Sequence, residues 1–320
     1  MADSIFRVEN LSLGFKVKHK VLNVLDDISF AVEKGKFLGI VGESGCGKSL
    51  TAMTIMRLLP PAAVVTSGSV QYKNRNLLEL SDSELLSVRG KEIAMIFQEP
   101  MTSLNPVHRI GDQIAEMLEL HGNMSVEERE SRCIEMLHAV NIPSPEKVLK
   151  QYPHELSGGM RQRAMIAMAM ACDQMLLLAD EPTTALDVTI QAQILQIMRK
   201  LKDQFDSSII MITHNLGVIH ETCDDVIVMY AGQIVEKAPV AELFKNPMHP
   251  YTVGLLECIV DVNAKKGRLP VIPGMVPSPE DFPAGCRFSP RCSHVCGGCN
   301  EKQPLIQVSD NHYVRCGSIN

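Results

Sequence analysis

One short stretch constrains this chain more than any other. It fits the pattern G-x-x-x-x-G-K-[ST] of a phosphate-binding loop and consists of Gly42, Glu43, Ser44, Gly45, Cys46, Gly47, Lys48 and Ser49. The apolar run 37–41 before it predicts a buried strand, and Leu50 to Leu59 after it predict a helix that Pro60-Pro61 would end. Strand, glycine-rich loop and helix in this order build an anion site, because backbone N–H groups and the helix start both face the phosphate.

Individual residues around this loop have separate expected roles. Lys48 can reach the outer phosphates of a nucleotide, and Ser49 can hold a magnesium ion. Leu50 starts the helix that follows. Phe15 lies upstream, and its ring could either stack on an adenine or belong to the core. Both interpretations of Phe15 stay open.

Composition excludes some classes of function. The 320 residues, 45% hydrophobic and 21% charged, leave room for two or three ordinary globular domains. A net charge of -6 argues against general nucleic-acid binding, which favours a basic surface. The N-terminus lacks the apolar core of a signal peptide, and the longest apolar run, 164–172, is far shorter than the roughly 18 residues that span a bilayer. We therefore expect a soluble, cytoplasmic protein whose membrane role depends on a partner.

Polar side chains follow three further apolar runs. These runs predict buried strands at 93–97, 175–179 and 209–213. Gln98 follows the first, Asp180 and Glu181 the second, and His214 the third. In open α/β sheets, ligands bind at the carboxyl ends of the strands, so we expect these side chains to serve one ligand.

The chemistry of these side chains suits hydrolysis of a nucleotide. Asp180 would hold magnesium through water, and Glu181 would polarise the attacking water as a general base. Gln98 could hold a metal-bound water or sense the terminal phosphate, and His214 could contact that phosphate. Two adjacent carboxylates at the end of an apolar strand are poorly explained as surface charge.

A helical insertion carries a second anion-binding loop. Helices are predicted at 110–121 and 125–139, the second with a capping box that starts at Ser125. The turn of Ser157, Gly158 and Gly159 precedes an Ala- and Met-rich helix, and Asp187 precedes another helix at 188–205. One nucleotide seldom needs two such loops, so we expect the second to serve the nucleotide of another subunit.

Half of the ten cysteines crowd the last 35 residues: Cys286, Cys292, Cys296, Cys299 and Cys316. In a reducing compartment this density indicates a metal rather than disulfides, and four thiolates suit zinc or an iron–sulfur cluster. Residues 263–285 predict an extended linker, and the tail looks too short for a hydrophobic core of its own. Cys296 could replace Cys299 as a ligand, and free thiols remain the alternative.

The motifs together resemble the ATP-binding subunit of an ABC transporter. Residues 42–49 resemble Walker A, 156–160 the signature and 175–180 Walker B. The other matching positions are Gln98 in the Q-loop, the catalytic Glu181, Asp187 in the D-loop and the switch His214. Met160 departs from the usual glutamine. The resemblance implies an α/β P-loop NTPase (RecA-like) core at 1–98 and 172–250 with an antiparallel β subdomain, a helical ABC-specific subdomain at 99–171, and a Cys-rich extension at 251–320.

Longer segments resemble the dipeptide, oligopeptide and nickel permease group. They are residues 98–106, 151–160, 183–193, 246–252 and 285–292. This resemblance implies a [4Fe-4S] cluster on Cys286, Cys292, Cys299 and Cys316, with zinc as the alternative. It also implies that Ser49, Gln98 and Asp180 hold the Mg²⁺ of bound ATP.

The resemblance implies partners as well. Two ATPase subunits, a paralogue or a second copy, would form a head-to-tail ATP sandwich in which Ser157 and Gly159 close over the ATP of the opposite subunit. They would lie at the cytoplasmic face of the membrane, beneath two integral membrane permeases and, indirectly, an extracellular solute-binding protein. A permease helix would dock near Gln98. The expected function is uptake of di- or oligopeptides, with nickel or another small solute as the alternative. A soluble ABC ATPase that acts on DNA or ribosomes is disfavoured by the single signature and the acidic composition.

Overall fold

The computed structural model describes residues 4–98, 103–122, 124–184, 186–258 and 271–319. The chain divides into two compact units. One unit contains residues 33–36 and 79–212, and the other contains residues 4–32, 37–78 and 213–320. Residues 99–102 of the segment that resembles a Q-loop, and residues 263–270 of the expected linker, lie outside the described residues.

The first unit is built on buried parallel strands. They are β6 (Ile93–Ile96), β7 (Leu176–Asp180) and β8 (Ser208–Thr213), ordered β8-β7-β6. Ile96 lies beside Ala179, and Asp180 lies beside Ile212. Every residue of β7 and β8 is buried, as expected for a parallel sheet covered on both faces. The three strands predicted from their apolar runs are confirmed to within one residue at either end.

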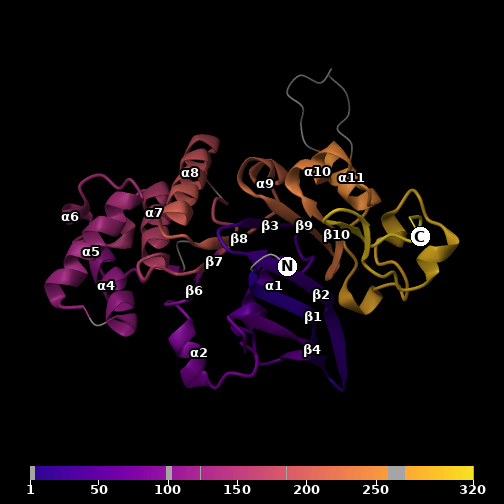
Figure 1. Cartoon of the computed structure of the whole chain (residues 1–320), viewed down its shortest axis with the longest axis horizontal. Helices are drawn as coiled ribbons and strands as arrows, with labels where there is room; N and C mark the ends of the chain where they lie inside the picture. The colour runs from indigo at the N-terminus through magenta and orange to yellow at the C-terminus, as the bar shows by residue number, and fades with distance from the viewer. Residues whose placement is uncertain (1–3, 99–102, 123, 185, 259–270, 320) are drawn as a thin grey trace. The chain divides into compact units, whose positions relative to one another are not determined.

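The helices of this unit follow their local capping signals. They are α2 (Asp82–Val88), α4 (Ile110–His121), α5 (Val126–Ala139), α6 (Pro145–Val148), α7 (Gly158–Ala169) and α8 (Val188–Gln204), with a 3-10 turn, η1 (Pro153–Glu155). Ser81 and Ser125 form capping boxes at the starts of α2 and α5, and the box at Ser125 confirms the prediction. Figure 1 shows α4, α5 and α7 gathered in one bundle, and these three helices pack against one another.

The second unit contains an antiparallel sheet near the N-terminus. Its strands are β1 (Ser4–Val17), β2 (Lys20–Glu33), β4 (Ala63–Tyr72) and β5 (Arg75–Asn76), in the order β2-β1-β4-β5 (Figure 1). Val8 on β1 pairs with Val70 on β4, and both side chains are fully buried. This sheet matches the antiparallel β subdomain expected from the resemblance.

Further strands of the second unit carry the phosphate-binding loop. They are β3 (Phe37–Val41), β9 (Asp225–Tyr230), β10 (Gln233–Pro239), β11 (Ile306–Ser309) and β12 (His312–Val314), in the order β11-β12-β10-β9-β3. β3 runs parallel to β9, and β9 and β10 form an antiparallel hairpin. The helices of this unit are α1 (Lys48–Ile55), α9 (Leu216–Thr222), α10 (Val240–Lys245) and α11 (Pro250–Glu257).

One predicted boundary is wrong. Helix α1 ends at Ile55, four residues before the expected Leu59. Arg57 takes a left-handed conformation, with φ of 50°. An α-helix cannot continue through such a residue, so the helix stops before Pro60 and Pro61 can act.

The cysteine-rich tail packs on the second unit instead of standing alone. Its short 3-10 turns are η2 (Pro279–Asp281), η3 (Ser289–Arg291) and η4 (Gly297–Asn300). Phe288 packs between Tyr230 and Tyr251, with ring centroids 5.1 and 5.4 Å away. Strand β12 pairs with β10, with Val314 opposite Glu236. The tail was expected to be too short for its own core, and it gains a core by sharing that of its neighbours.

Helix lengths bear on membrane crossing. The longest helix of the described residues, α8, has 17 residues and an amphipathic pattern. Among the residues described by the structure, no helix combines the length and apolar character needed to cross a membrane.

Candidate functional site

The phosphate-binding loop has a backbone that only glycine fits at two positions. Gly42 leaves β3 with φ of 155°, and a Cβ there would lie 2.2 Å from the carbonyl oxygen of Met229. Gly47 is the N-cap of α1 with φ of 104°, and a Cβ there would lie 2.6 Å from the Leu25 side chain. The sequence pattern thus folds into the predicted strand, loop and helix.

Lys48 is turned into this loop. It is only 5% exposed, and its Nζ donates hydrogen bonds to the carbonyl oxygens of Gly42, at 2.8 Å, and Glu43, at 3.0 Å. Ser44 and Gly45 are exposed at the tip of the loop. Ser49 and Leu50 are half-buried on the first turn of α1. The Lys48 ammonium is thus held beside the loop backbone at the start of a helix, a position that suits the binding of a phosphate.

The two predicted carboxylates lie at the end of β7 in the first unit. Asp180 is the last residue of that strand and is 5% exposed. Glu181 follows with φ of 46°, and its N–H donates to the carbonyl oxygen of Ile212 at 2.8 Å. Gln98 is brought to the same place: its Nε2 donates to Glu181 Oε2 at 3.2 Å. Gln98 and Glu181 thus meet at one sheet edge, and their roles toward a nucleotide stay predictions.

A further residue at this edge was missed by the sequence reasoning. The Thr184 hydroxyl donates to Glu181 Oε2 at 2.7 Å. Thr184 and Gln98 therefore orient the same carboxylate oxygen. A hydroxyl residue three positions after the carboxylate, in a tight turn, is the signal that would have found it.

The second anion loop caps a helix, as predicted. The Ser157 hydroxyl accepts the Met160 N–H at 3.3 Å at the start of α7, and Asp187 accepts the Ile190 N–H at 2.9 Å at the start of α8. Both residues border one surface cavity of about 590 Å³, which Gly158, Gly159, Met160 and Arg163 also line. Two helix N-termini and an arginine favour a negatively charged occupant. Met160 contributes its backbone N–H to the cap, so the departure from glutamine leaves the cap intact.

Phe15 and His214 are the remaining predicted site residues. Phe15 lies on β1 opposite Ala63 and is half-buried, so it is not a fully enclosed core residue. His214 is exposed directly after β8, at the carboxyl end of the strand as expected. Neither role is tested by the structure, and both remain predictions.

The tail cysteines do not form the four-thiolate site that was expected. None of the ten cysteines, all of them among the residues that the structure describes, forms a disulfide, and the Sγ atoms of Cys296 and Cys299 are 3.7 Å apart. Burial, with a smaller contribution from the charges of Cys299 and Cys316, raises the pKa of the Cys286 thiol. In the described part of the chain, no group of three or more His, Cys, Asp or Glu side chains is arranged to hold a metal ion. The thiols lie near one another, but this arrangement does not fit a metal or cluster.

Comparison with known proteins decides the family. Residues 25–184 match the family model described as ABC transporter. This chain belongs to the ABC transporter family. Residues 235–299 of the cassette also match the model described as the C-terminal region of oligopeptide/dipeptide transporters. The cassette is therefore an ABC-type ATPase, which binds ATP with Mg²⁺ and hydrolyses it.

Relatives resemble the cassette over nearly its whole length. The "Probable peptide ABC transporter ATP-binding protein y4tR" of Sinorhizobium fredii is 52% identical over 100% of this chain and 96% of that protein. The "Oligopeptide transport ATP-binding protein AppD" of Bacillus subtilis is 46% identical over 98% of this chain and 96% of that protein.

A solved structure supports the cassette fold. It is a dimeric ATP-binding cassette in a post-hydrolysis state bound to ADP and phosphate, 28% identical, with a TM-score of 0.66. The match covers 73% of this chain and 98% of that one. The α/β fold with an antiparallel sheet and a helical bundle is thereby confirmed as that of an ABC cassette.

Proposed function

We propose that this cassette is the ATP-hydrolysing subunit of an importer for di- or oligopeptides. The match of residues 235–299 to the C-terminal region of oligopeptide/dipeptide transporters supports this assignment. So do the names of relatives such as AppD and OppD of Bacillus subtilis, both oligopeptide transport ATP-binding proteins. These names favour peptides over nickel as the solute.

Within this function, the site residues divide the work. Lys48 and the backbone N–H groups of residues 42–49 bind the phosphates of ATP. Ser49, Gln98 and Asp180 hold Mg²⁺, directly or through water, and the metal neutralises charge on the phosphates. Phe15 stacks on the adenine, and His214 contacts the terminal phosphate. These roles rest on the chemistry of each side chain and on the family pattern.

Glu181 is the proposed general base, and its geometry is the observation that carries the mechanism. Glu181 is the residue after the buried Asp180. One oxygen of its carboxylate accepts hydrogen bonds from the side chains of Gln98, at 3.2 Å, and Thr184, at 2.7 Å. A carboxylate fixed in this way can accept a proton from a water without first reorganising. Thr184 and Gln98 are then positioning residues for the base.

Replacing Glu181 with glutamine tests this role. Glu181→Gln keeps the shape of the side chain but removes the proton acceptor, so we expect ATP hydrolysis to fall at least about 100-fold. Affinity for ATP should stay within about twofold, because the change leaves the phosphate loop intact. The measurements are steady-state phosphate release and titration with a fluorescent ATP analogue.

Lys48→Ala is the matched control for the binding half of this experiment. Removing the ammonium should abolish detectable ATP binding. Hydrolysis by Glu181→Gln at the wild-type rate would refute the assignment of the base, and ATP binding by Lys48→Ala at wild-type affinity would refute the assignment of the loop.

The proposed assembly is a pair of ATPase subunits beneath two permeases at the cytoplasmic face of the membrane. Ser157 and Gly158 are exposed beside the cavity at the start of α7, which suits contact with ATP on a second subunit. The dimeric cassette that this chain resembles supports such pairing. The second subunit is a paralogue or another copy of this chain, and an extracellular binding protein would deliver the solute.

The metal content of the tail is a prediction from the family resemblance alone. A cluster on Cys286, Cys292, Cys299 and Cys316 predicts about four irons per chain and a visible absorption band in anaerobically purified protein. Stoichiometric zinc without iron would assign zinc instead. Protein free of both metals would contradict the prediction and agree with the arrangement of the thiols described above.

A further inference from the structure

Glu43, in the phosphate-binding loop, is held at its carboxylate, its backbone N–H and its backbone carbonyl. Its carboxylate accepts hydrogen bonds from Arg291, Nη1 to Oε2 at 2.6 Å and Nη2 to Oε1 at 2.9 Å. Its N–H donates to the Tyr251 hydroxyl at 2.9 Å. Its carbonyl oxygen accepts from Lys48 Nζ at 3.0 Å. Side chains from the C-terminal part of the chain thus fix the residue that helps to place the loop lysine.

Arg291 is itself held rigidly on the tail side. Its side chain is 4% exposed, and its Nε donates to the carbonyl oxygen of Pro273 at 2.8 Å. The hydrogen bonds to Glu43, opposed by burial, raise the pKa of the guanidinium. Two parallel hydrogen bonds between a guanidinium and a carboxylate fix both distance and orientation, which a lysine cannot reproduce.

Tyr251 holds the second contact with equal rigidity. Its side chain is fully buried, and its ring packs at 4.7 Å from Tyr230 and 5.4 Å from Phe288. Burial raises the pKa of the Tyr251 hydroxyl, so the phenol stays protonated. Phe288 of the tail belongs to the same aromatic group, so α11 and the tail are both in contact with the group that holds the Glu43 backbone.

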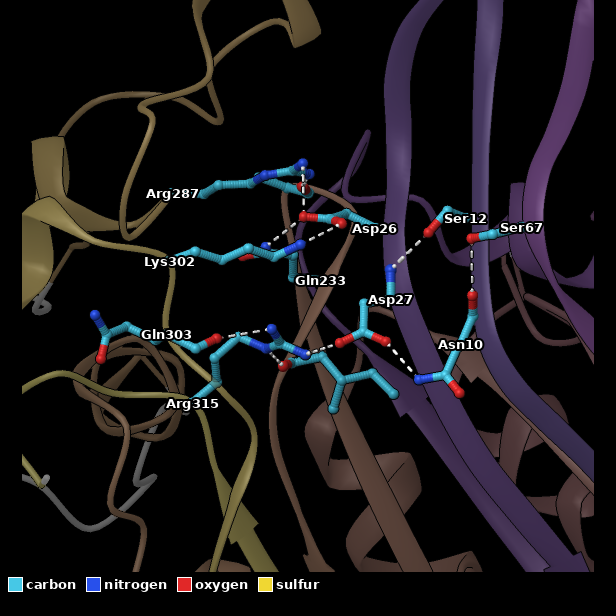
Figure 2. Close-up of polar contacts among 12 residues, drawn as sticks. Asn10, Ser12, Asp26, Asp27, Ser67, Gln233, Arg287, Lys302, Gln303 and Arg315 are labelled. Carbon is cyan, nitrogen blue, oxygen red and sulfur yellow. Dashed lines mark hydrogen bonds and ion pairs between the residues drawn. The ribbon is translucent and has the colours of Figure 1, made fainter.

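A second connection reaches the loop from another side. The Gly232 N–H donates to the Cys46 carbonyl oxygen at 2.8 Å, and the neighbouring Ala231 carbonyl accepts a hydrogen bond from Arg287 of the tail. Arg287 also pairs with Asp26 at 3.2 Å (Figure 2). Burial would raise the pKa of Asp26, but hydrogen bonds from Lys302 and Gln233 and the charge of Arg287 outweigh it and lower that pKa.

We propose that Arg291 is a positioning residue of the ATP site, through which the C-terminal tail sets the affinity of the phosphate-binding loop for ATP. The path runs from the Arg291 guanidinium to the Glu43 carboxylate, and from the Glu43 carbonyl to the Lys48 ammonium. This inference rests on the proposed role of residues 42–49 as the phosphate-binding loop. It adds that the tail is part of the nucleotide machinery rather than only an appendage.

The inference predicts an effect on affinity rather than on the chemical step. Arg291 acts on Glu43, whose carbonyl oxygen accepts a hydrogen bond from the Lys48 ammonium. Without the Arg291 side chain, the loop would also adopt conformations in which the Lys48 ammonium is not positioned for the phosphates, so ATP binding would weaken. The rate at saturating ATP should change little, because the same bound state is reached.

Arg315 offers a matched control. It is also a buried arginine of the tail, with a 4% exposed side chain, and it contacts Asp27 and the carbonyl oxygens of Ile234 and Gln303 (Figure 2). Arg315→Ala should loosen the tail as much as Arg291→Ala does, as judged by the thermal midpoint. It should leave ATP affinity within about twofold of wild type, because its contacts avoid the loop.

The test is a titration of each full-length variant with a fluorescent ATP analogue, together with steady-state hydrolysis. Arg291→Ala should raise Kd and KM about tenfold with kcat within about twofold, the scale expected for losing a partly exposed charge-assisted pair. Arg291→Lys should recover part of the loss, which also provides a variant if the alanine form does not fold. Arg291→Ala combined with Glu43→Ala should cost no more than either change alone, because both act on one interaction.

Equal affinities in wild type and Arg291→Ala would overturn the inference. So would an equal loss in Arg315→Ala, since that would show a general loosening of the tail. Lys48→Ala separates these results from failure of the proposed function: if it loses ATP while Arg291→Ala does not, the loop assignment stands and the inference alone falls.

Discussion

Glu181 combines a functional side chain with a strained backbone. Its φ of 46° lies in the left-handed region, which costs a non-glycine residue about 1–2 kcal/mol. The hydrogen bond from its N–H to Ile212 and the contacts from Gln98 and Thr184 hold it there. Strain that several contacts maintain is typical of residues with a catalytic role.

His249 is a second residue whose state is set by its surroundings. Burial lowers its pKa from 6.5 to about 3. The ring Nδ1 accepts a hydrogen bond from the Tyr251 backbone N–H at 3.0 Å. The backbone N–H of His249 donates to Glu236 Oε2 at 2.9 Å. The ring therefore caps α11 as a neutral group, since a proton on Nδ1 would break the cap.

The depressed pKa of His249 makes stability depend on pH. Between about pH 3 and 6.5 the unfolded chain binds one more proton at this position than the folded chain. The stabilisation is fully present above pH 6.5 and falls as pH decreases below it, by about 1.4 kcal/mol per pH unit. His249→Asn keeps an acceptor for the cap but does not titrate, so its thermal midpoint should fall less steeply between pH 7 and 5.

The measurement is the thermal midpoint of wild type and His249→Asn at several pH values. Similar midpoints near pH 7.5 would show that the asparagine caps α11 adequately. Parallel curves for the two proteins at lower pH would mean that His249 does not contribute this pH dependence.

Sequence predicts site residues where the chemistry is local. Residues 42–49 form a contiguous pattern, and Gln98, Asp180 and His214 each follow a buried run, so strand ends alone indicate them. The pair of Glu43 and Arg291 spans 248 positions, and no periodic pattern connects them. Within residues 285–292, only the cysteines and the family likeness stand out in the sequence, and neither assigns a partner to Arg291.

At the scale of helices, the starts were more predictable than the ends. Ser81 and Ser125 each begin a capping box. The serine side chain accepts from the backbone N–H three residues later, and the glutamate at that position accepts from the serine N–H, so the signal lies within four residues. The end of α1 depends on the left-handed Arg57, which no residue type announces. The proline pair that begins three residues after Arg57 is a clear signal, but the helix ends before it.

At the scale of strands, burial decided which could be predicted. β7 and β8 are covered on both faces, so their sequences are continuous apolar runs. β12 has three residues and pairs with β10, some 75 positions earlier in the chain. A strand this short has no readable period, so the sequence does not predict the pairing by which the tail docks.

At the scale of the whole molecule, each of the two units contains different motifs of an ABC cassette. The second unit holds the phosphate-binding loop with its tail, and the first holds the carboxylates with the signature helix. Ser157 and Asp187 border a cavity of about 590 Å³ on the first unit, lined by two helix N-termini. The account assigns this cavity to ATP that is bound by a second subunit.

The most direct test of the account is ATP-dependent association of this chain. Glu181→Gln, which should bind ATP without hydrolysing it, is mixed with MgATP, alone and with the second ATPase subunit of its transporter, and followed by sedimentation velocity. The account predicts a complex of two ATPase subunits with two bound ATP that disperses when ATP is removed and does not form with Lys48→Ala. A single sedimenting subunit in every mixture, with ATP bound, would contradict it.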